Sequence, residues 1–186
     1  MDRPTFSIAP AQPHHAADIA AIYAHHVAHG SASFETAAPD PAAMATRMAK
    51  VLDAGAPWLV ALAADGALDG GALLGYAYAS QFRDRPAYRL TCENSIYIRH
   101  DRRGEGLGKA LLAALIEASS RAGFRQMIAV IGGGEPGSVA LHTALGFAHA
   151  GRMRSIGRKH GRWLDTVYMQ LPLGAGDSMP PEHEPL

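Results

Sequence analysis

The sequence predicts an α/β (α+β) fold in which a mixed central β-sheet carries helices on both faces. Short apolar or alternating runs typical of strands fill the middle and the end of the chain, and longer amphipathic runs lie before and among them. The first strand-like runs follow one another without a helical run between them, so we expect this part of the sheet to be antiparallel. A chain of 186 residues fits one domain.

The first half of the chain is expected to contribute two helices and four strands. Ile19, Ile22 and Val27 recur on one helix face, and Asp40 followed by Pro41 is a typical helix start. Asp65-Gly66 predicts a turn between two of the strands. The expected helices cover 13–29 and 41–54, the strands 5–8, 58–64, 72–80 and 91–98, and an arginine-rich loop 81–90.

The second half is expected to alternate helices and strands after a glycine-rich turn. The expected order is a turn at 103–108, a helix at 109–121, a strand at 126–131, a helix at 136–145, and two strands from 147 and over 163–171. We expect one domain over 1–173 and a mobile tail over 174–186, because the tail has proline, glycine and acidic residues without periodicity.

Composition and charge argue against several classes of function. The 17 basic and 17 acidic residues cancel, which disfavours nucleic-acid and anionic-membrane binding, because both favour a basic excess. No apolar run is long enough to span a bilayer, and residues 1–10 lack a signal-peptide pattern. The single cysteine, Cys92, excludes an intrachain disulfide. We therefore expect a cytoplasmic, enzyme-sized domain.

The turn Arg103-Gly104-Glu105-Gly106-Leu107-Gly108-Lys109 follows a predicted strand and precedes a predicted helix. Glycines let the backbone approach a ligand, and the free N–H groups of a helix start attract an anion. The Gly-Lys-Ser/Thr ending of a Walker A loop is missing, and too little parallel structure precedes the turn for a dinucleotide fingerprint. The turn therefore predicts a phosphate site, with an ordinary tight turn as the alternative.

The pattern Arg-x-x-Gly-x-Gly at Arg103, Gly106 and Gly108 resembles the acetyl-CoA pyrophosphate loop of the GNAT superfamily. Ser95–Ile98 resembles the strand that pairs with the pantetheine arm, and Leu141–Phe147 resembles the later helix with its Leu-Gly-Phe ending. The resemblance implies acetyl-CoA as co-substrate and no metal. The cofactor contacts it implies are Ile96, Tyr97, Ile98, Arg103, Gly104, Glu105, Gly106, Leu107, Gly108, Lys109 and Ser138.

A narrower resemblance covers residues 6–173 and points to the phosphinothricin and methionine sulfoximine N-acetyltransferase family. It rests on Ser33–Thr36, Glu93–Ile98, the glycine turn, Gln126–Gly132 and Gly161–Asp165. This family implies a sheet that splays around residues 96–98, a homodimer, and small amino-acid analogues such as phosphinothricin, methionine sulfone and methionine sulfoximine as substrates. One departure is Glu135, which stands where the family usually has a cofactor-contacting asparagine.

Glu93 and His142 are the candidate catalytic residues. An α-amine is mostly protonated at neutral pH and must lose a proton before it attacks a thioester, and the resemblance places the glutamate matching Glu93 in the active site. His142 stands where many GNAT enzymes have a tyrosine, and a histidine can protonate the leaving thiolate. The alternatives are a surface or ion-paired glutamate and a histidine satisfied within a helix interface.

The loop with Arg83 and Arg85 is expected to contact the acceptor, because a guanidinium suits a carboxylate or phosphinate. The alternative is a solvated arginine paired with Asp84, while Phe34 and Trp163 either line the site across a dimer interface or pack as core. The predicted substrate contacts are Phe34, Phe82, Arg83, Arg85, Thr91, Cys92 and Glu93.

Five histidines near the start, among them His25 and His29 on one helix face, are not expected to bind a metal, because no carboxylate or cysteine completes a ligand set. Cys92 is expected to point away from the face of Glu93, which favours direct transfer to the amine over an acyl-cysteine. The predicted function is N-acetylation of a small amino acid. A protein or peptide N-acetyltransferase and a non-catalytic acyl-CoA sensor are the alternatives.

Overall fold

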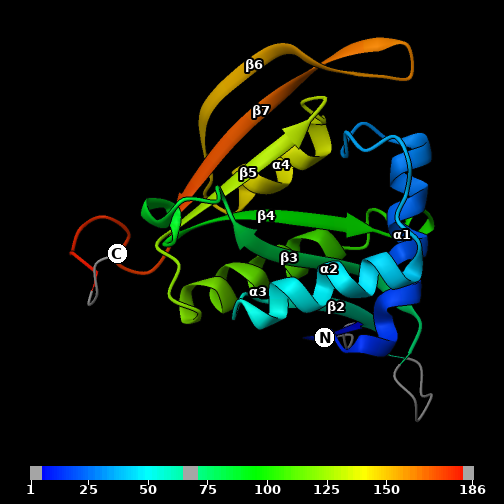
Figure 1. The fold of residues 1–186 in the computed structure, drawn as a ribbon, viewed down its shortest axis with the longest axis horizontal. Coiled ribbons are helices and arrows are strands. Elements are labelled where there is room, and N and C mark those ends of the chain that lie inside the picture. The colour runs from blue at the N-terminus through cyan, green and yellow to red at the C-terminus, as the bar shows by residue number, and fades with distance from the viewer. Residues whose placement is uncertain (1–5, 65–70, 182–186) are drawn as a thin grey trace.

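A computed structural model describes residues 6–64 and 71–181 of the chain. In these ranges seven strands form one sheet in the order β1-β2-β3-β4-β5-β7-β6 (Figure 1). The predicted Asp65-Gly66 turn lies outside the described residues. The strands are β1 Phe6–Pro10, β2 Trp58–Ala63, β3 Leu73–Gln81, β4 Thr91–Ile98, β5 Gln126–Gly132, β6 Ala148–Lys159 and β7 Arg162–Pro172, and the helices are α1 Ala16–His29, α2 Pro41–Asp53, α3 Leu107–Arg121 and α4 Pro136–Ala144.

Helices cover both faces of the sheet, as the sequence predicted. Ile19 of α1 and Met48 of α2 are buried with Tyr76 of the sheet in one apolar cluster. Leu111 of α3 is buried in a second cluster on the other face, together with Met127 of β5. Because successive side chains of a strand point to opposite faces, the strands β1 to β4 supply both clusters.

The sheet is antiparallel from β1 to β4, which confirms the expectation for the first group of strands. The pairing of β4 with β5 is parallel, but it begins at Thr91 and ends where Asn94 faces Ala129. Beyond that point residues 95–98 and 130–132 run on without pairing to each other. This separation is the splay that the resemblance predicted around residues 96–98, and it begins at Ser95.

Local signals explain most element boundaries. The side chain of Asp40 accepts a hydrogen bond from the Ala43 N–H at 2.7 Å, so the predicted helix start at Pro41 is confirmed. The first predicted helix is corrected at its beginning, because Pro13–His15 forms a 3-10 turn before α1. The His15 Nδ1 accepts a hydrogen bond from the Gln12 N–H at 2.9 Å there and holds that turn.

The hairpin of β6 and β7 forms the outer edge of the molecule and arches away from its body (Figure 1). Nearly every side chain of β6 is exposed although the strand has 12 residues. After β7 the chain turns back at Leu173, whose N–H donates to the Arg125 carbonyl at 2.9 Å. The Arg125 guanidinium in turn donates to the Pro180 carbonyl at 3.4 Å. The domain boundary at residue 173 and the mobility of the tail stay predictions.

Among the helices of the described ranges, none has both the length and the apolar character that a bilayer crossing requires.

Gly132→Ala is expected to lower the free energy of unfolding by about 1–3 kcal/mol, because the close packing at the end of β5 leaves no room for a side chain. An added Cβ would lie 2.5 Å from the Ser31 carbonyl oxygen and 3.0 Å from Cε1 of Phe34. Urea unfolding followed by circular dichroism measures the change.

Gly151→Ala is the matched control, since an added Cβ at this position of β6 meets no atom within 4 Å. We expect its unfolding midpoint to stay at the wild-type value. Equal midpoints for the two variants would contradict the close packing of Gly132 against the chain at Ser31.

Candidate active site

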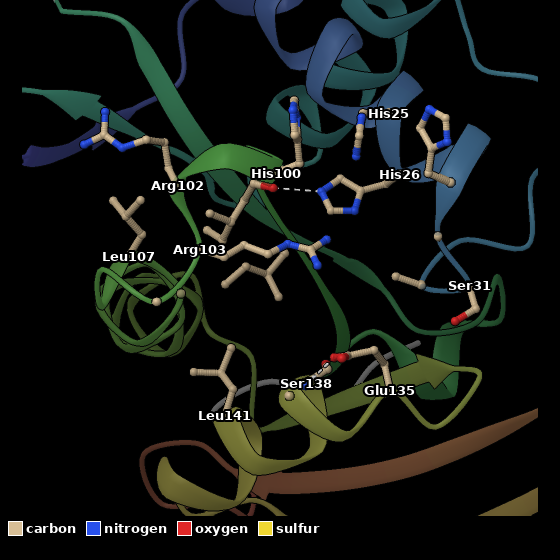
Figure 2. A pocket seen from close by; sticks show the side chains of 18 of the residues that line it. His25, His26, Ser31, His100, Arg102, Arg103, Leu107, Glu135, Ser138 and Leu141 are labelled. Atoms are coloured by element: carbon tan, nitrogen blue, oxygen red, sulfur yellow. Dashed lines mark hydrogen bonds between the residues drawn. The ribbon is translucent and has the colours of Figure 1, made fainter.

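A cavity of about 700 Å³ lies at the end of β4 where the sheet opens (Figure 2). Its wall is formed by the end of β4, the glycine turn, the starts of α3 and α4, the end of α1 and the turn between β6 and β7. Its volume is within the range of small-molecule and cofactor sites. Elements far apart in the sequence therefore meet around one space.

The glycine turn presents its backbone to this cavity. Gly104 and Gly106 have φ angles of +83° and +81°, a conformation that favours glycine, and α3 begins directly after them at Leu107. No side chain caps that helix start, so its first N–H groups are available to an anion. The starts of α3 and α4 are close neighbours here, because a Cβ added at Gly108 would be in van der Waals contact with Cδ2 of Leu141 at 3.4 Å.

Most predicted cofactor residues share this cavity. The lining set contains Ile96, Ile98, Arg103, Gly104, Gly106, Leu107, Gly108 and Ser138. Glu105 is directed to an ion pair with Arg102 at 2.8 Å, and Lys109 is exposed outside the lining. The ring of Tyr97 packs against Tyr23 and Tyr76, so only its backbone is available on this side.

Glu135 acts as the N-cap of α4, which accounts for its departure from the family pattern. Its Oε2 accepts a hydrogen bond from the Ser138 N–H at 2.6 Å, and Pro136 occupies the first position of the helix. A carboxylate at this position is stabilised by the free N–H groups and the dipole of the helix. The Glu135 carboxylate therefore occupies the place at the start of α4 where an anion could otherwise bind, and it also lines the cavity.

A narrow space of about 50 Å³ occupies the gap between β4 and β5. Asn94, Ser95 and His142 line it, and it shares Ile96 and Ser138 with the larger cavity. The gap exists because the strands stop pairing at Asn94. A group held in the large cavity can therefore reach through the sheet at this point.

His142 is 2% exposed and has both ring nitrogens in contact with oxygens. Nδ1 lies 2.7 Å from the Ser138 carbonyl oxygen, and Nε2 lies 3.1 Å from Oδ1 of Asn94. A neutral imidazole has one N–H, so this geometry requires either an imidazolium or a rotated Asn94 amide. Burial lowers the pKa of His142, and the Ser138 carbonyl opposes that shift.

Asn94 is the residue of this pair that the sequence analysis missed. Its Nδ2 donates to the Ile128 carbonyl at 3.4 Å while Oδ1 faces His142. A signal existed in the alternation of β4, which places Asn94 on the same face as Cys92 and opposite to Glu93. What the sequence could not supply is the position of α4 above that face.

Glu93 is half-buried on the face of the sheet that carries α1 and α2, beside Ser80 of the neighbouring strand. Burial raises the pKa of its carboxyl, and the positive charge of Arg83 partly offsets that rise. The Arg83 guanidinium lies 4.1 Å from the centre of the Phe82 ring and donates to the Phe82 carbonyl at 2.9 Å. A carboxylate with a raised pKa is suited to accept a proton near neutral pH.

The other predicted substrate contacts are spread more widely. Arg85 is exposed in the loop, and Thr91 is half-buried at the start of β4. Cys92 is fully buried against α3, and burial raises the pKa of its thiol to about 12, which leaves no thiolate near neutral pH. Phe34 packs on Gly132 and Gly157, away from the loop of Arg83.

Histidines gather at the other end of the large cavity. The ring of His25 stacks on the ring of His100, with 4.0 Å between their centroids. The centroid of the His29 ring lies 4.7 Å from that of His25. Within the described ranges, no group of three or more histidine, cysteine, aspartate or glutamate residues is placed to hold a metal ion.

Comparisons with known proteins agree with this geometry. Residues 9–168 match the family described as an acetyltransferase (GNAT) domain. A phosphinothricin N-acetyltransferase from Alcaligenes faecalis is 52% identical over 88% of this chain and 81% of its own length. An L-methionine sulfoximine/L-methionine sulfone acetyltransferase from Pseudomonas aeruginosa is 46% identical over 59% of this chain and 64% of its own.

Among solved structures, a phosphinothricin acetyltransferase from Sinorhizobium meliloti in complex with acetyl-CoA superposes with a TM-score of 0.92. It is 47% identical, and the match covers 96% of this chain and 94% of the other. The resemblance found in the sequence is confirmed along nearly the whole length, and the chain belongs to the GNAT acetyltransferase family.

Proposed function

We propose that this protein is an acetyl-CoA-dependent N-acetyltransferase that transfers acetyl directly to the α-amine of a small amino acid or analogue of the phosphinothricin, methionine sulfoximine or methionine sulfone type. The observation that carries the proposal is the half-buried Glu93 on one face of the opened sheet, with the glycine turn at the end of the same strand. The full-length similarity to phosphinothricin N-acetyltransferases supports the same substrate class.

The residues around the large cavity fit acetyl-CoA. The free N–H groups at the start of α3 and the side chain of Arg103 would hold its phosphates. The backbone of 96–98, which has no partner on β5, would hydrogen-bond its extended arm. When bound, acetyl-CoA supplies the acetyl group as a reactive thioester.

Glu93 is the proposed general base. The ammonium form of the substrate has a pKa about one to three units above neutrality. Its deprotonation at neutral pH therefore costs about 1.4 kcal/mol for each unit, and a positioned carboxylate offsets that free energy. Burial, which raises the pKa of Glu93, brings its basicity closer to that of the amine. His142, positioned by Asn94 and Ser138, is the proposed proton donor on the opposite face of the sheet.

An aromatic trough that reaches Ser80, the cross-strand neighbour of Glu93, supports an amino-acid analogue as acceptor. Its volume is about 530 Å³, and it lies between α2 and the ends of β2 and β3. The stacked rings of Trp58 and Tyr78, 4.1 Å apart, line it. Its charged lining residues are Lys50, Asp84, Arg89 and Arg47, the last of which pairs with Glu35. Such a trough suits a flat or aliphatic side chain that ends in an oxygen-rich or acidic group.

Thiol release from acetyl-CoA in the presence of different amines tests the substrate class. We expect turnover with phosphinothricin, methionine sulfoximine and methionine sulfone, and little with peptides or polyamines. Turnover confined to peptides or polyamines would discard the amino-acid assignment. Binding of acetyl-CoA without turnover across the whole panel would favour a non-catalytic sensor.

Glu93→Gln is expected to lower kcat/KM about 100-fold or more at neutral pH, because the amide cannot accept a proton. In the wild type, activity should fall as pH decreases through the raised pKa of Glu93, since only the carboxylate acts as a base. This acidic limb of the pH profile should vanish in the variant. An unchanged rate with a good amine substrate would remove Glu93 from the mechanism.

Arg83→Gln provides a second test of the proposed role of the Glu93 carboxyl. Because the charge of Arg83 lowers the pKa of Glu93, its loss should move the acidic limb to higher pH. Arg121→Gln is the control, since Arg121 is exposed at the end of α3 and pairs with Glu117 at 3.6 Å. We expect the control to keep the wild-type profile.

The proposal includes a homodimer formed through the edge of the sheet. The long, exposed edge strand β6 presents unpaired backbone groups, which natural proteins normally cover. Ile156 and Trp163 are 50% and 62% exposed on the same hairpin, and Phe34 beside it is 38% exposed. A cytoplasmic location and the absence of nucleic-acid partners stay predictions.

Ile156→Glu is expected to convert the dimer to a monomer, because it replaces an exposed apolar side chain of the proposed contact with a charged one. Light scattering coupled to size-exclusion chromatography measures the mass. Leu52→Glu on α2 is the control, because it likewise replaces an exposed aliphatic side chain with a glutamate, and it should leave the dimer intact. A monomeric wild-type protein would contradict the proposed association.

A further inference from the structure

Three histidines from two separate segments meet at the rim of the large cavity. His25 and His29 belong to the last turns of α1, and His100 follows β4. The His25 ring is nearly parallel to the His100 ring, with an angle of 13° and a centroid distance of 4.0 Å. Figure 2 shows His25 and His100 on the same side of the pocket, with Arg103 extending below them into the space.

The surroundings of this histidine cluster (His25, His29 and His100) are strongly basic. His26 is held by a 2.8 Å hydrogen bond to the Ile98 carbonyl, and Asp101 is paired with Arg99 at 2.7 Å. Among the described residues that line the cavity, Glu135 is the one acidic side chain, and it caps α4. The other charged or titratable lining residues are His26, Arg102, Arg103, Lys159, His160 and Arg162.

The neutral form of His25 is favoured at this position. Partial burial lowers the pKa of His25, and the neighbouring His100, His29 and Arg103 lower it further. A dianionic phosphate placed among these groups would reverse that effect, because it favours the protonated form of each imidazole. Binding of such a ligand and uptake of protons would then be linked.

The glycine turn accounts for only part of the charge that acetyl-CoA carries. The ligand has a diphosphate and a separate 3′-phosphate, whereas the start of α3 offers one group of backbone N–H donors. The histidine cluster lies on the same cavity as that helix start, on the other side of Arg103. A second anion position on this wall therefore has both the location and the charge to hold a further phosphate.

We propose that His25, His29 and His100, together with Arg103, form a phosphate subsite for the nucleotide end of acetyl-CoA, and that the histidines take up protons when it binds. The proposal rests on the use of acetyl-CoA stated above. It assigns an anion-binding function, and no metal binding, to the histidines of α1.

The direction of the pH dependence follows from the linkage. In the proposed subsite, bound phosphate raises the pKa of the histidines above their pKa in the protein without ligand. The affinity for acetyl-CoA therefore rises as pH falls from the higher pKa to the lower one. The 3′-phosphate of the ligand is a monoester with a second pKa near 6, and its protonation weakens binding at low pH equally for every protein variant. The comparison between variants therefore isolates the contribution of the histidines.

Isothermal titration of the full-length protein with acetyl-CoA between about pH 6 and pH 8.5 tests the proposal. We expect the wild type to bind about tenfold more tightly at the lower pH, which corresponds to about one pKa unit of coupling. The double variant His25→Gln/His100→Gln should lose most of this dependence. Titrations in two buffers of different ionisation enthalpy should reveal proton uptake by the wild type and little by the variant.

His149→Gln is the matched control, because His149 is exposed on β6 outside the cavity. It should retain the wild-type pH dependence and proton uptake. Because His29 and His100 are exposed, His29→Gln offers a second, structurally mild variant, and we expect an intermediate loss. Circular dichroism of each variant checks that the fold is kept.

Acetyl-dephospho-CoA separates the two sources of phosphate. If the pH dependence is lost with this ligand, the 3′-phosphate binds at the cluster. If the pH dependence is retained, the diphosphate binds there. Either result agrees with the proposal. The same pH dependence in wild type and double variant would overturn the subsite while leaving acetyl-CoA use intact. Failure to bind acetyl-CoA at any pH would overturn both.

Discussion

The end of pairing between β4 and β5 is the constraint on which the site depends. The parallel ladder stops where Asn94 faces Ala129, and both strands continue beyond it. Residues 95–98 remain paired with β3, but their backbone groups on the side of β5 have no partner there, and such groups must find hydrogen bonds elsewhere. In the proposed function an extended ligand arm would supply these hydrogen bonds, and the glycine turn at the end of β4 would hold the charged part of the ligand.

This opening divides the chemistry between two faces of one sheet. Alternation along β4 places Asn94 toward α4 and His142, and Glu93 on the face that carries α1 and α2. Burial moves the two catalytic candidates in opposite directions, raising the pKa of Glu93 and lowering that of His142. A raised pKa strengthens Glu93 as a base, and a lowered pKa makes the His142 imidazolium a stronger acid. In the proposed function a proton would be accepted on one face and another donated on the opposite face, without direct contact between the two side chains.

Local charge around the site differs from the balance of the whole chain. The sequence has a formal net charge of zero. Among the described residues, the wall of the large cavity nevertheless carries arginines, a lysine and several histidines, with a single glutamate that caps α4. The α1 end, the turn after β4 and the β6–β7 turn bring these cations together from distant parts of the chain. Net charge disfavoured a general polyanion binder, whereas the fold concentrates positive charge where a small polyanionic ligand would bind.

The sequence by itself determined the order of the elements, the boundaries of β4, the cap at Asp40 and the glycine turn, because each depends on residues close together in the chain. It also identified Glu93 and His142 through a family pattern. Only the tertiary structure decided that Asn94 contacts His142, that Glu135 lines the cavity it helps to form, and that His25 stacks on His100. These contacts join residues up to 75 positions apart, as in the pairing of His25 with His100. Periodicity reports which face a side chain occupies, but the packing of one element on another decides what that face meets.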